Sequence, residues 1–434
     1  MNPKRIGFVV VAVLALLCAP GASHAVLNAV DPGPYTAAFG NFSRWYQDTH
    51  GVALELCLSK AVSPDPAAAG GLMCVLLPGA AFDPALPIVF PTNFPDESFW
   101  FAADGILTTG TGDPGTGTVS LRYVAAVEAA FANGEVIDGQ QVSFARVRFF
   151  ADVPEPGTYT VTHPYGVEVF EVPAVGAGRE IQFTRDVGIG APGDFTGALK
   201  GDIGPFLVRA AGPITVGTET FIGDPNVLQT VTGSPFGTNF LRIQGPGGID
   251  ASESQFTVAG KIYDNTVLST PLVVERSTYG RNTSQTQIDV FALSPPAATV
   301  SFNDNANFSW PMNGDPAGKF FGQALNTTAN IQGSITVNAA NAGNTAVSVP
   351  GNVTDVVSIT KMEYSLATGT LTIEASSSDE NPLPTLTAGA FGDLGNPVVS
   401  IQTLTVSGLT IPPATVTVTS SAGGSDTEEV VVLP

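Results

Sequence analysis

Two stretches in the last third of the chain repeat one pattern, and this repeat restricts the possible fold more than any other feature of the sequence. Residues 276–279 (RSTY) match residues 361–364 (KMEY), and residues 288–292 (IDVFA) match residues 371–375 (LTIEA). In each unit a basic residue and a tyrosine precede a polar turn and a strand that alternates apolar and polar residues. The order of the matches favours a duplication over a chance alignment of two strand-rich stretches. Each unit has about 80 residues, the size of a small β-sandwich.

The composition predicts β structure elsewhere in the chain as well. Gly and Pro number 48 and 34, charged residues are only 13%, and few segments combine the residues that favour helices. Residues 118–131 have apolar residues at near-helical spacing, but the turn signals Asn133-Gly134 and Asp138-Gly139 that follow favour a strand. In the next run, Arg146 and Arg148 alternate with apolar residues. We therefore expect an all-β chain.

The first 25 residues have the three-part pattern of a secretory signal peptide. Lys4 and Arg5 precede an apolar run at residues 6–17, which is too short for a stable membrane anchor. Small residues at Ser23 and Ala25 suit a cleavage site, so we expect a mature chain that begins at Val26. No later apolar run is long enough to span a membrane, so we expect a secreted protein, free or associated with the periplasm or cell surface.

The mature chain of roughly 409 residues is too long for one hydrophobic core, so several domains are expected. We expect an aromatic-rich segment at 26–112, a β-sandwich at 113–272, and the two repeats at 273–356 and 357–434.

The mature chain contains two cysteines, Cys57 and Cys74, which an oxidising compartment would join in a disulfide. A zinc site is the alternative, but two thiols with distant histidines are a poor ligand set.

Two groups of residues carry a resemblance to known proteins. The repeats, with TYGRNTSQTQIDVFA (278–292) and MEYSLATGTLTIEASSSD (362–379), resemble immunoglobulin-like modules of secreted and cell-surface bacterial proteins. The stretches FARVRFFADVPEPGTYTVTHPYGVEVFEV (144–172) and SRWYQDTHGVALELCL (43–58) resemble a set of uncharacterised secreted bacterial proteins. The resemblance implies tandem immunoglobulin-like β-sandwiches after a signal peptide, and it implies no activity and no site residue.

The net charge argues against some classes of partner. Without Lys4 and Arg5 the mature chain has 15 basic and 38 acidic residues, a net charge of −23. Such a surface repels nucleic acid and anionic lipid, so neither is expected as a partner.

Four aromatic residues are candidates for ligand contact: Trp45, Tyr46, Trp100 and Trp310. Trp45 and Tyr46 are adjacent, and Trp100 stands between Phe99 and Phe101. Adjacent residues of a strand point to opposite faces, so at least one residue of each of these two groups is expected outside the core. The alternative is that these rings fill a core.

Calcium is the one cofactor for which the sequence offers ligands. Asp304 follows the expected strand at 299–302, and Asp379 and Glu380 occupy a similar place in the second repeat. Loops between tandem sandwiches often bind this ion, although acidic and amide residues are also common in plain turns.

No motif in the sequence identifies a reaction. The chain has no nucleophile elbow, and nothing marks out a pair of carboxylates for glycosidic cleavage. We therefore expect an extracytoplasmic binding or structural protein that recognises a glycan, a polymer or a surface protein through residues 26–272, with the repeats as spacers. The alternative is a secreted polymer-degrading hydrolase, which requires a convergent polar cleft in the first 270 residues.

Overall fold

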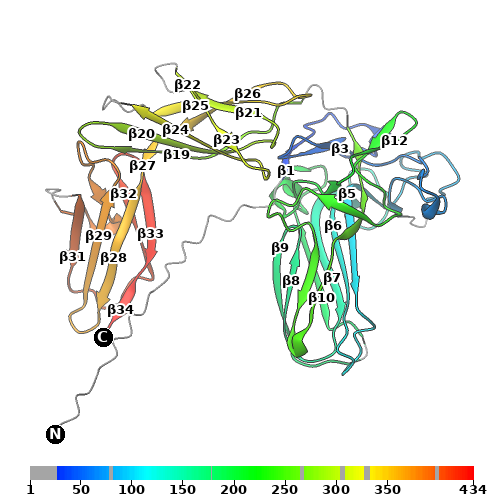
Figure 1. The fold of residues 1–434 in the computed structure, drawn as a ribbon, viewed down its shortest axis with the longest axis horizontal. Coiled ribbons are helices and arrows are strands. Elements are labelled where there is room, and N and C mark those ends of the chain that lie inside the picture. The colour runs from blue at the N-terminus through cyan, green and yellow to red at the C-terminus, as the bar shows by residue number, and fades with distance from the viewer. Residues whose placement is uncertain are drawn as a thin grey trace, which may run out of the picture.

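The computed structural model describes residues 27–77, 82–176, 178–263, 268–303, 308–326, 333–395 and 400–434. The expected signal peptide and Val26 lie outside these residues. Nearly every regular element is a β-strand, with a few short 3-10 helices, as the composition predicts. The chain forms an N-terminal body followed by two sandwiches, which together make an arch with the first sandwich across its top (Figure 1).

Three sheets make up the N-terminal body, residues 27–263. The first has the order β1 (Leu27–Val30), β2 (Trp45–Asp48), β3 (Ala53–Glu55), β18 (Lys261–Ile262), β13 (Glu219–Phe221), β12 (Ile214–Val216). The largest sheet has eight strands: β10 (Ile181–Val187), β7 (Gln141–Asp152), β6 (Ser120–Phe131), β5 (Glu97–Thr108), β17 (Gln255–Ala259), β14 (Gln229–Thr232) and β11 (Val208–Arg209), with β4 (Leu76–Leu77) also pairing with β5. The third has the order β16 (Asp250–Glu253), β15 (Leu241–Gln244), β8 (Gly157–His163), β9 (Gly166–Val172).

One hydrophobic core joins the three sheets of this body. Its buried side chains run from Leu27 to Val258 without a break between the two segments that the sequence separated at residue 112. That boundary falls in the hairpin loop between β5 and β6, whose strands pair from Ser98 to Thr108. The described parts of 27–112 and 113–263 are therefore one body, because their strands share a sheet and a core, whereas Leu272 packs against the core of the first sandwich.

The four-stranded sheet covers one face of the long strands β5, β6 and β7. Tyr123 of β6 lies 5.2 Å from the ring of His163, and Phe149 of β7 lies 5.8 Å from Phe170. The stretch 118–131 forms a strand, as the turn signals favoured. The opposite face of these strands is the open face of the eight-stranded sheet.

The two sandwiches share one strand order, to which the first adds the short strands β22 and β23. In the first, one sheet contains β23 (Asn313–Gly314), β24 (Lys319–Asn326), β20 (Thr286–Leu293), β19 (Val273–Arg281) and β27 (Thr354–Asp355), and the other contains β22 (Ser309–Pro311), β21 (Thr299–Asn303), β25 (Ser334–Ala340) and β26 (Val347–Asn352). In the second, the sheets are β31 (Ile401–Val406), β29 (Thr370–Ser377), β28 (Val357–Ser365), β34 (Val431–Leu433), and β30 (Leu386–Thr387), β32 (Thr415–Ser420), β33 (Ser425–Glu429).

The pairing registers confirm the repeat. Tyr279 lies opposite Ile288, and Tyr364 lies opposite Leu371, so the two tyrosines occupy equivalent places. Each first strand has an irregularity at the same place, just before the basic residue Arg276 or Lys361. Each first strand also pairs in parallel with the last strand of its own unit.

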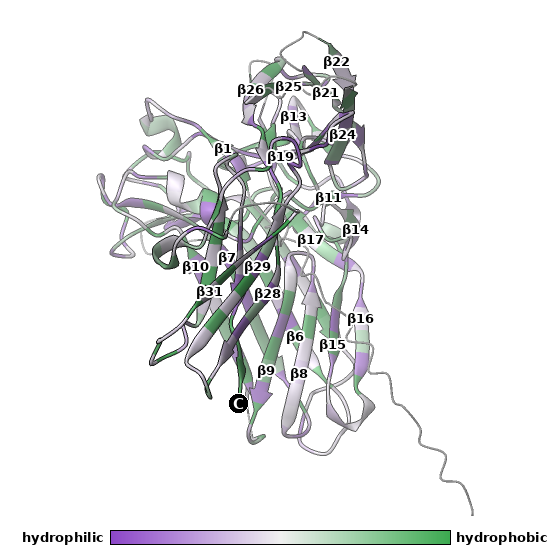
Figure 2. Ribbon diagram, turned by 90° about the vertical axis from the view of Figure 1, so that its left-hand side faces the viewer, coloured by the Kyte–Doolittle hydropathy of each residue, from purple (hydrophilic) through white to green (hydrophobic). Residues whose placement is uncertain are grey.

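Apolar and polar residues alternate along these strands, visible as bands of colour in Figure 2. Ile288, Val290, Leu371 and Ile373 are buried, whereas Asp289 and Thr372 on the opposite side are partly exposed.

Candidate functional site

Two of the aromatic residues proposed for ligand contact lie in the core. Tyr46 and Trp100 are fully buried with ring centroids 4.8 Å apart. The Tyr46 hydroxyl donates to the Phe195 carbonyl oxygen at 2.6 Å, and the Trp100 indole N–H donates to the Ser43 carbonyl oxygen at 3.1 Å. We therefore do not retain Tyr46 and Trp100 as binding residues.

The expectation that one residue of each aromatic group lies outside the core fails here, because the strands depart from simple alternation or are covered on both faces. The register of β5 shifts between Phe99 and Phe101, so both Trp100 and Phe101 are buried. Strand β2 is buried along its whole length, which shows that it is covered on both faces.

Trp45 is also buried, with 9% of its surface exposed, whereas Trp310 lies nearer the surface. Trp45 stacks on Tyr263 at 6.1 Å and lines a cavity of about 240 Å³ with Tyr35, Phe39 and Arg44. Trp310 in β22 is partly buried against the core of the first sandwich.

The acidic residues proposed for calcium are in different situations. Asp304 lies outside the described residues. Both oxygens of Asp379 accept hydrogen bonds from Arg281, at 2.8 and 2.6 Å, and one also accepts from the Tyr279 hydroxyl. Glu380 lines a polar cavity at the junction of the two sandwiches. Among the described residues no group of three or more His, Cys, Asp or Glu side chains suits a metal ion, and in this structure Asp379 serves as an ion-pair partner.

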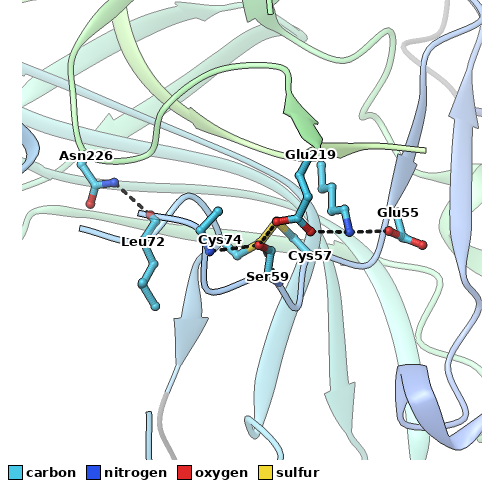
Figure 3. The surroundings of a disulfide bond; sticks show 9 residues. Glu55, Cys57, Ser59, Leu72, Cys74, Glu219 and Asn226 are labelled. Carbon is cyan, nitrogen blue, oxygen red and sulfur yellow. Dashed lines mark hydrogen bonds and ion pairs between the residues drawn. A yellow bond between two sulfur atoms is a disulfide. The ribbon is translucent and has the colours of Figure 1, made fainter. Parts of the chain in front are cut away.

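The disulfide between Cys57 and Cys74 is confirmed, with the two Cα atoms 5.4 Å apart. The loop that it closes is also tied to a distant segment of the chain (Figure 3). The Asn226 amide donates to the Leu72 carbonyl oxygen at 2.9 Å, and the Ser59 hydroxyl donates to Glu219 at 2.5 Å. Lys261 lies 2.8 Å from both Glu55 and Glu219. These contacts tie the loop to strand β13 and to the turn that follows it.

The open face of the eight-stranded sheet carries an unusual set of side chains. Strands β5, β6, β7 and β10 pair antiparallel, so their outward residues form rows across the sheet. The rows are Ala102–Ala126–Arg146–Asp186, Asp104–Val124–Arg148–Thr184 and Ile106–Arg122–Phe150–Gln182. Arg179, outside these strands, lies with its guanidinium 4.2 Å from the centre of the Phe150 ring.

Ion pairs fix most of the charged groups on the open face. Arg146 contacts Glu128 at 2.8 Å and Asp186 at 2.7 Å, and Arg122 donates from Nε to Asp104 at 3.0 Å. Arg148 differs, because its Nε donates to the Thr184 hydroxyl at 3.1 Å, and no carboxylate of the described residues lies within ion-pair distance of it. The Arg148 guanidinium is therefore available to a ligand.

Glu128 is the most strongly perturbed acid of this face. Only 2% of the surface of Glu128 is exposed. Burial raises the pKa of Glu128 to about 7, even though the ion pair with Arg146 opposes the shift and the nearby Glu97 adds to it. Burial therefore disfavours the ionised form of Glu128.

A hollow of about 260 Å³ opens on this face. Its walls combine apolar groups, among them Phe99, Val124 and Phe150, with the charged groups Asp104, Arg122, Glu128, Arg146 and Arg148. Val75, Leu77 and Pro225 close one side. The guanidinium and carboxylate groups that the ion pairs orient can donate and accept several hydrogen bonds, and the phenyl rings offer flat apolar surface.

Sequence reasoning missed this site, although one signal for it was present. Arg146 and Arg148 alternate with apolar residues, and two charged residues in so apolar a strand indicate that one face of the strand is polar. The partners Asp104, Arg122 and Asp186 come from three other strands, and their position depends on strand pairing.

These observations define the class of protein: it is an all-β multidomain protein in which a three-sheet body is followed by two tandem β-sandwiches. No protein-family model matches the chain, and no curated protein sequence matches it. Within the described residues no helix is long and apolar enough to cross a membrane.

Solved structures with which the chain aligns are mainly tandem immunoglobulin domains. The tandem immunoglobulin repeats of Dlar share 15% identity over 38% of this chain and 98% of theirs, with a TM-score of 0.18. Immunoglobulin domains 1–4 of Sidekick-1 share 10% identity over 67% of this chain and 83% of theirs, with a TM-score of 0.18. SGBP-B of the Bacteroides ovatus mixed-linkage glucan utilization locus, in complex with a mixed-linkage heptasaccharide, shares 13% identity over 45% of this chain and 49% of its own, with a TM-score of 0.18. At these scores the likenesses carry no argument about function.

Proposed function

We propose that the protein is exported and binds a neutral glycan outside the cytoplasm through the open face of the eight-stranded sheet. The observation that carries this proposal is the hollow on that face, where ion-paired carboxylates and guanidinium groups lie beside Phe99 and Phe150. Sugar hydroxyls both donate and accept hydrogen bonds, so a surface with fixed donors and fixed acceptors suits them. Export is supported by the pattern of residues 1–25 and by the disulfide, which persists in oxidising compartments.

The charges of the face favour a neutral ligand over an acidic one. Arg122 and Arg146 are already paired with carboxylates, so they offer hydrogen bonds without a net positive charge. The formal net charge of −21 also repels a polyanion at long range.

The proposal predicts that Arg148 contributes to binding. Arg148→Ala removes a guanidinium that holds no carboxylate, so the fold should be retained while the dissociation constant rises about tenfold, or roughly 1.4 kcal/mol. Affinity electrophoresis of the full chain in gels with cellulose-type glucan, xylan or mannan measures this, with pectate as the acidic polymer. Arg242→Ala is the matched control, because Arg242 pairs with Asp250 on the four-stranded sheet of the same body, away from the open face. Absence of retardation in all neutral gels, or equal effects of the two variants, contradicts the proposal.

Hydrolysis of such a glycan is a second candidate function, and the raised pKa of Glu128 favours it. A glycosidase requires one carboxyl group that is protonated near neutral pH and a second that is ionised, and Glu97 and Asp104 line the same hollow. The ion pair with Arg146 and the burial of Glu128 oppose this role, because a general acid must reach the glycosidic oxygen. Release of reducing sugar that Glu128→Gln abolishes would establish hydrolysis, and retardation without release would establish binding alone.

A further inference from the structure

The first sandwich carries an aromatic pair on the outer face of one of its sheets. Arg276, Phe291 and Phe321 lie in register on β19, β20 and β24. The two rings are 5.0 Å apart, and the Arg276 guanidinium lies 4.3 Å from the centre of the Phe291 ring. Phe321 is 39% exposed and Leu325, further along β24, is 54% exposed.

The second sandwich shows that the fold does not require these aromatic residues. The same register there places Lys361, Glu374 and Thr403 in one row. The basic residue is kept, whereas both phenylalanines are replaced by polar residues at the paired positions of the second sandwich. An exposed phenyl ring lowers solubility. Because the second sandwich forms the same strand pairing without one, strand pairing alone does not account for Phe291 and Phe321.

A row of oriented polar groups lies next to the aromatic pair. The amide nitrogens of Gln287 and Gln323 both donate to Asp289, at 2.9 Å in their shorter bonds. An ionised carboxylate only accepts hydrogen bonds, so both amides must turn their nitrogen to Asp289, which leaves their carbonyl oxygens free for other donors. The corresponding row of the second sandwich contains threonines, Thr372 opposite Thr405.

The polar row continues into a cavity of about 340 Å³ at the junction of the two sandwiches. Gln287 and Asp289 line it, together with Asn282, Gln285 and Glu380. From Phe291 to Gln287 along β20 the surface extends about 14 Å, at ~3.4 Å per residue.

We propose that this surface, formed by Phe291, Phe321, Asp289, Gln287 and the adjoining cavity, is a second binding site for a neutral saccharide chain. The phenyl rings stack on sugar rings, and the amide and carboxylate oxygens accept from hydroxyl groups. Asp289 and Glu380 repel an anionic ligand. Two rings and one leucine provide much less apolar area than the roughly 800 Å² per partner of a protein interface.

This inference rests on the proposed function in the choice of ligand, and it changes the role of the first sandwich from a spacer to a binding module. Two sites on one chain bind one polymer with higher apparent affinity than either site alone, provided that the polymer reaches both.

The test uses the full chain in the same gels of neutral polysaccharide. Phe291→Glu with Phe321→Thr introduces the residues of the second sandwich, so the variant should fold and its apparent dissociation constant should rise at least about tenfold through the loss of avidity. Leu366→Thr is the control, because Leu366 is an exposed apolar residue of the second sandwich that lies outside this surface. Circular dichroism and thermal unfolding verify that both variants are folded.

The possible results separate the two proposals. If the double variant binds like the parent while Arg148→Ala binds weakly, the second site does not exist and the proposed function stands. If the double variant loses binding while Arg148→Ala does not, the first site is refuted and the second is supported. Lack of retardation of the parent chain by every neutral polysaccharide refutes both. Equal loss in Leu366→Thr also overturns the second site.

Discussion

At the scale of single residues, burial decides which acids are held in place and which are perturbed. Burial on its own would raise the pKa of Asp379, but the hydrogen bonds from Arg281 and Tyr279 outweigh it and hold the pKa below its usual value. Glu128 is the reverse case, because its burial outweighs the ion pair with Arg146. One carboxylate therefore stabilises a junction, and the other carries a cost in its ionised form.

Glu128→Gln should change how stability depends on pH. Burial raises the pKa of Glu128 from 4.5 to about 7, so the folded state binds this proton more tightly than the unfolded chain does. The parent protein therefore loses stability as the pH rises from about 4.5 to about 7, whereas the Gln variant cannot ionise there. Relative to the parent, the variant should gain roughly 3 kcal/mol across this window, at ~1.36 kcal/mol per pKa unit.

Urea unfolding of both proteins between pH 4 and pH 8 measures the difference. Burial also raises the pKa of Asp48 to about 7, but this group is present in both proteins and cancels in the comparison. Parallel stability curves for the two proteins would show that Glu128 does not titrate in this window.

At the scale of elements, alternation along a strand determines which side chains a sandwich buries. In β29, Leu371 and Ile373 are fully buried, and Thr372 between them faces outward. The loop closed by Cys57 and Cys74 has no such pattern, and there the cross-link contributes roughly 3 kcal/mol by restricting the unfolded chain.

Ile373→Ala and Thr372→Ala should therefore differ strongly in stability. Ile373→Ala opens a cavity in the core of the second sandwich and should lower the free energy of unfolding by about 2–5 kcal/mol. Thr372→Ala removes only outward-facing atoms and should cost well under about 1 kcal/mol. Chemical unfolding of the full chain, followed for the transition of this sandwich, measures both values, and similar losses would mean that the register of β29 is incorrect.

At the scale of the whole molecule, a buried ion pair joins the two sandwiches. Arg281 of β19 and Asp379, just after β29, form a bidentate pair that Tyr279 extends. The Arg281 N–H donates to the Ser378 carbonyl oxygen, and the Glu380 N–H donates to the Arg281 carbonyl oxygen. These backbone hydrogen bonds flank the ion pair on both sides of Asp379. The cavity of the second proposed site lies at the same junction, so its shape depends on these contacts.

Asp379→Ala should loosen the junction. The substitution removes the carboxylate to which Arg281 and Tyr279 both donate, and the loss of these hydrogen bonds at a largely buried site costs about 1–3 kcal/mol. We expect a larger radius of gyration in small-angle X-ray scattering and faster proteolysis between the sandwiches. Asp250→Ala, which removes an exposed pair with Arg242, should leave both measurements unchanged. An unchanged scattering profile for Asp379→Ala would show that other contacts hold the junction.

The sequence by itself determined the local features of this protein. Alternation identified the strands, the match between residues 276–292 and 361–375 identified the repeat, and the two mature cysteines identified the disulfide. These features depend on neighbours along the chain or on a match between two stretches, so a pattern in one dimension contains them.

Only the tertiary structure decided which faces are covered and which distant residues meet. It placed Trp100 in the core, and it joined residues 27–112 and 113–263 in one body. It also brought Asp104, Arg122 and Arg148 together from three strands. Strand order and the covering of a face are set by long-range packing, and the alternation of a single strand is the same whichever neighbour it pairs with.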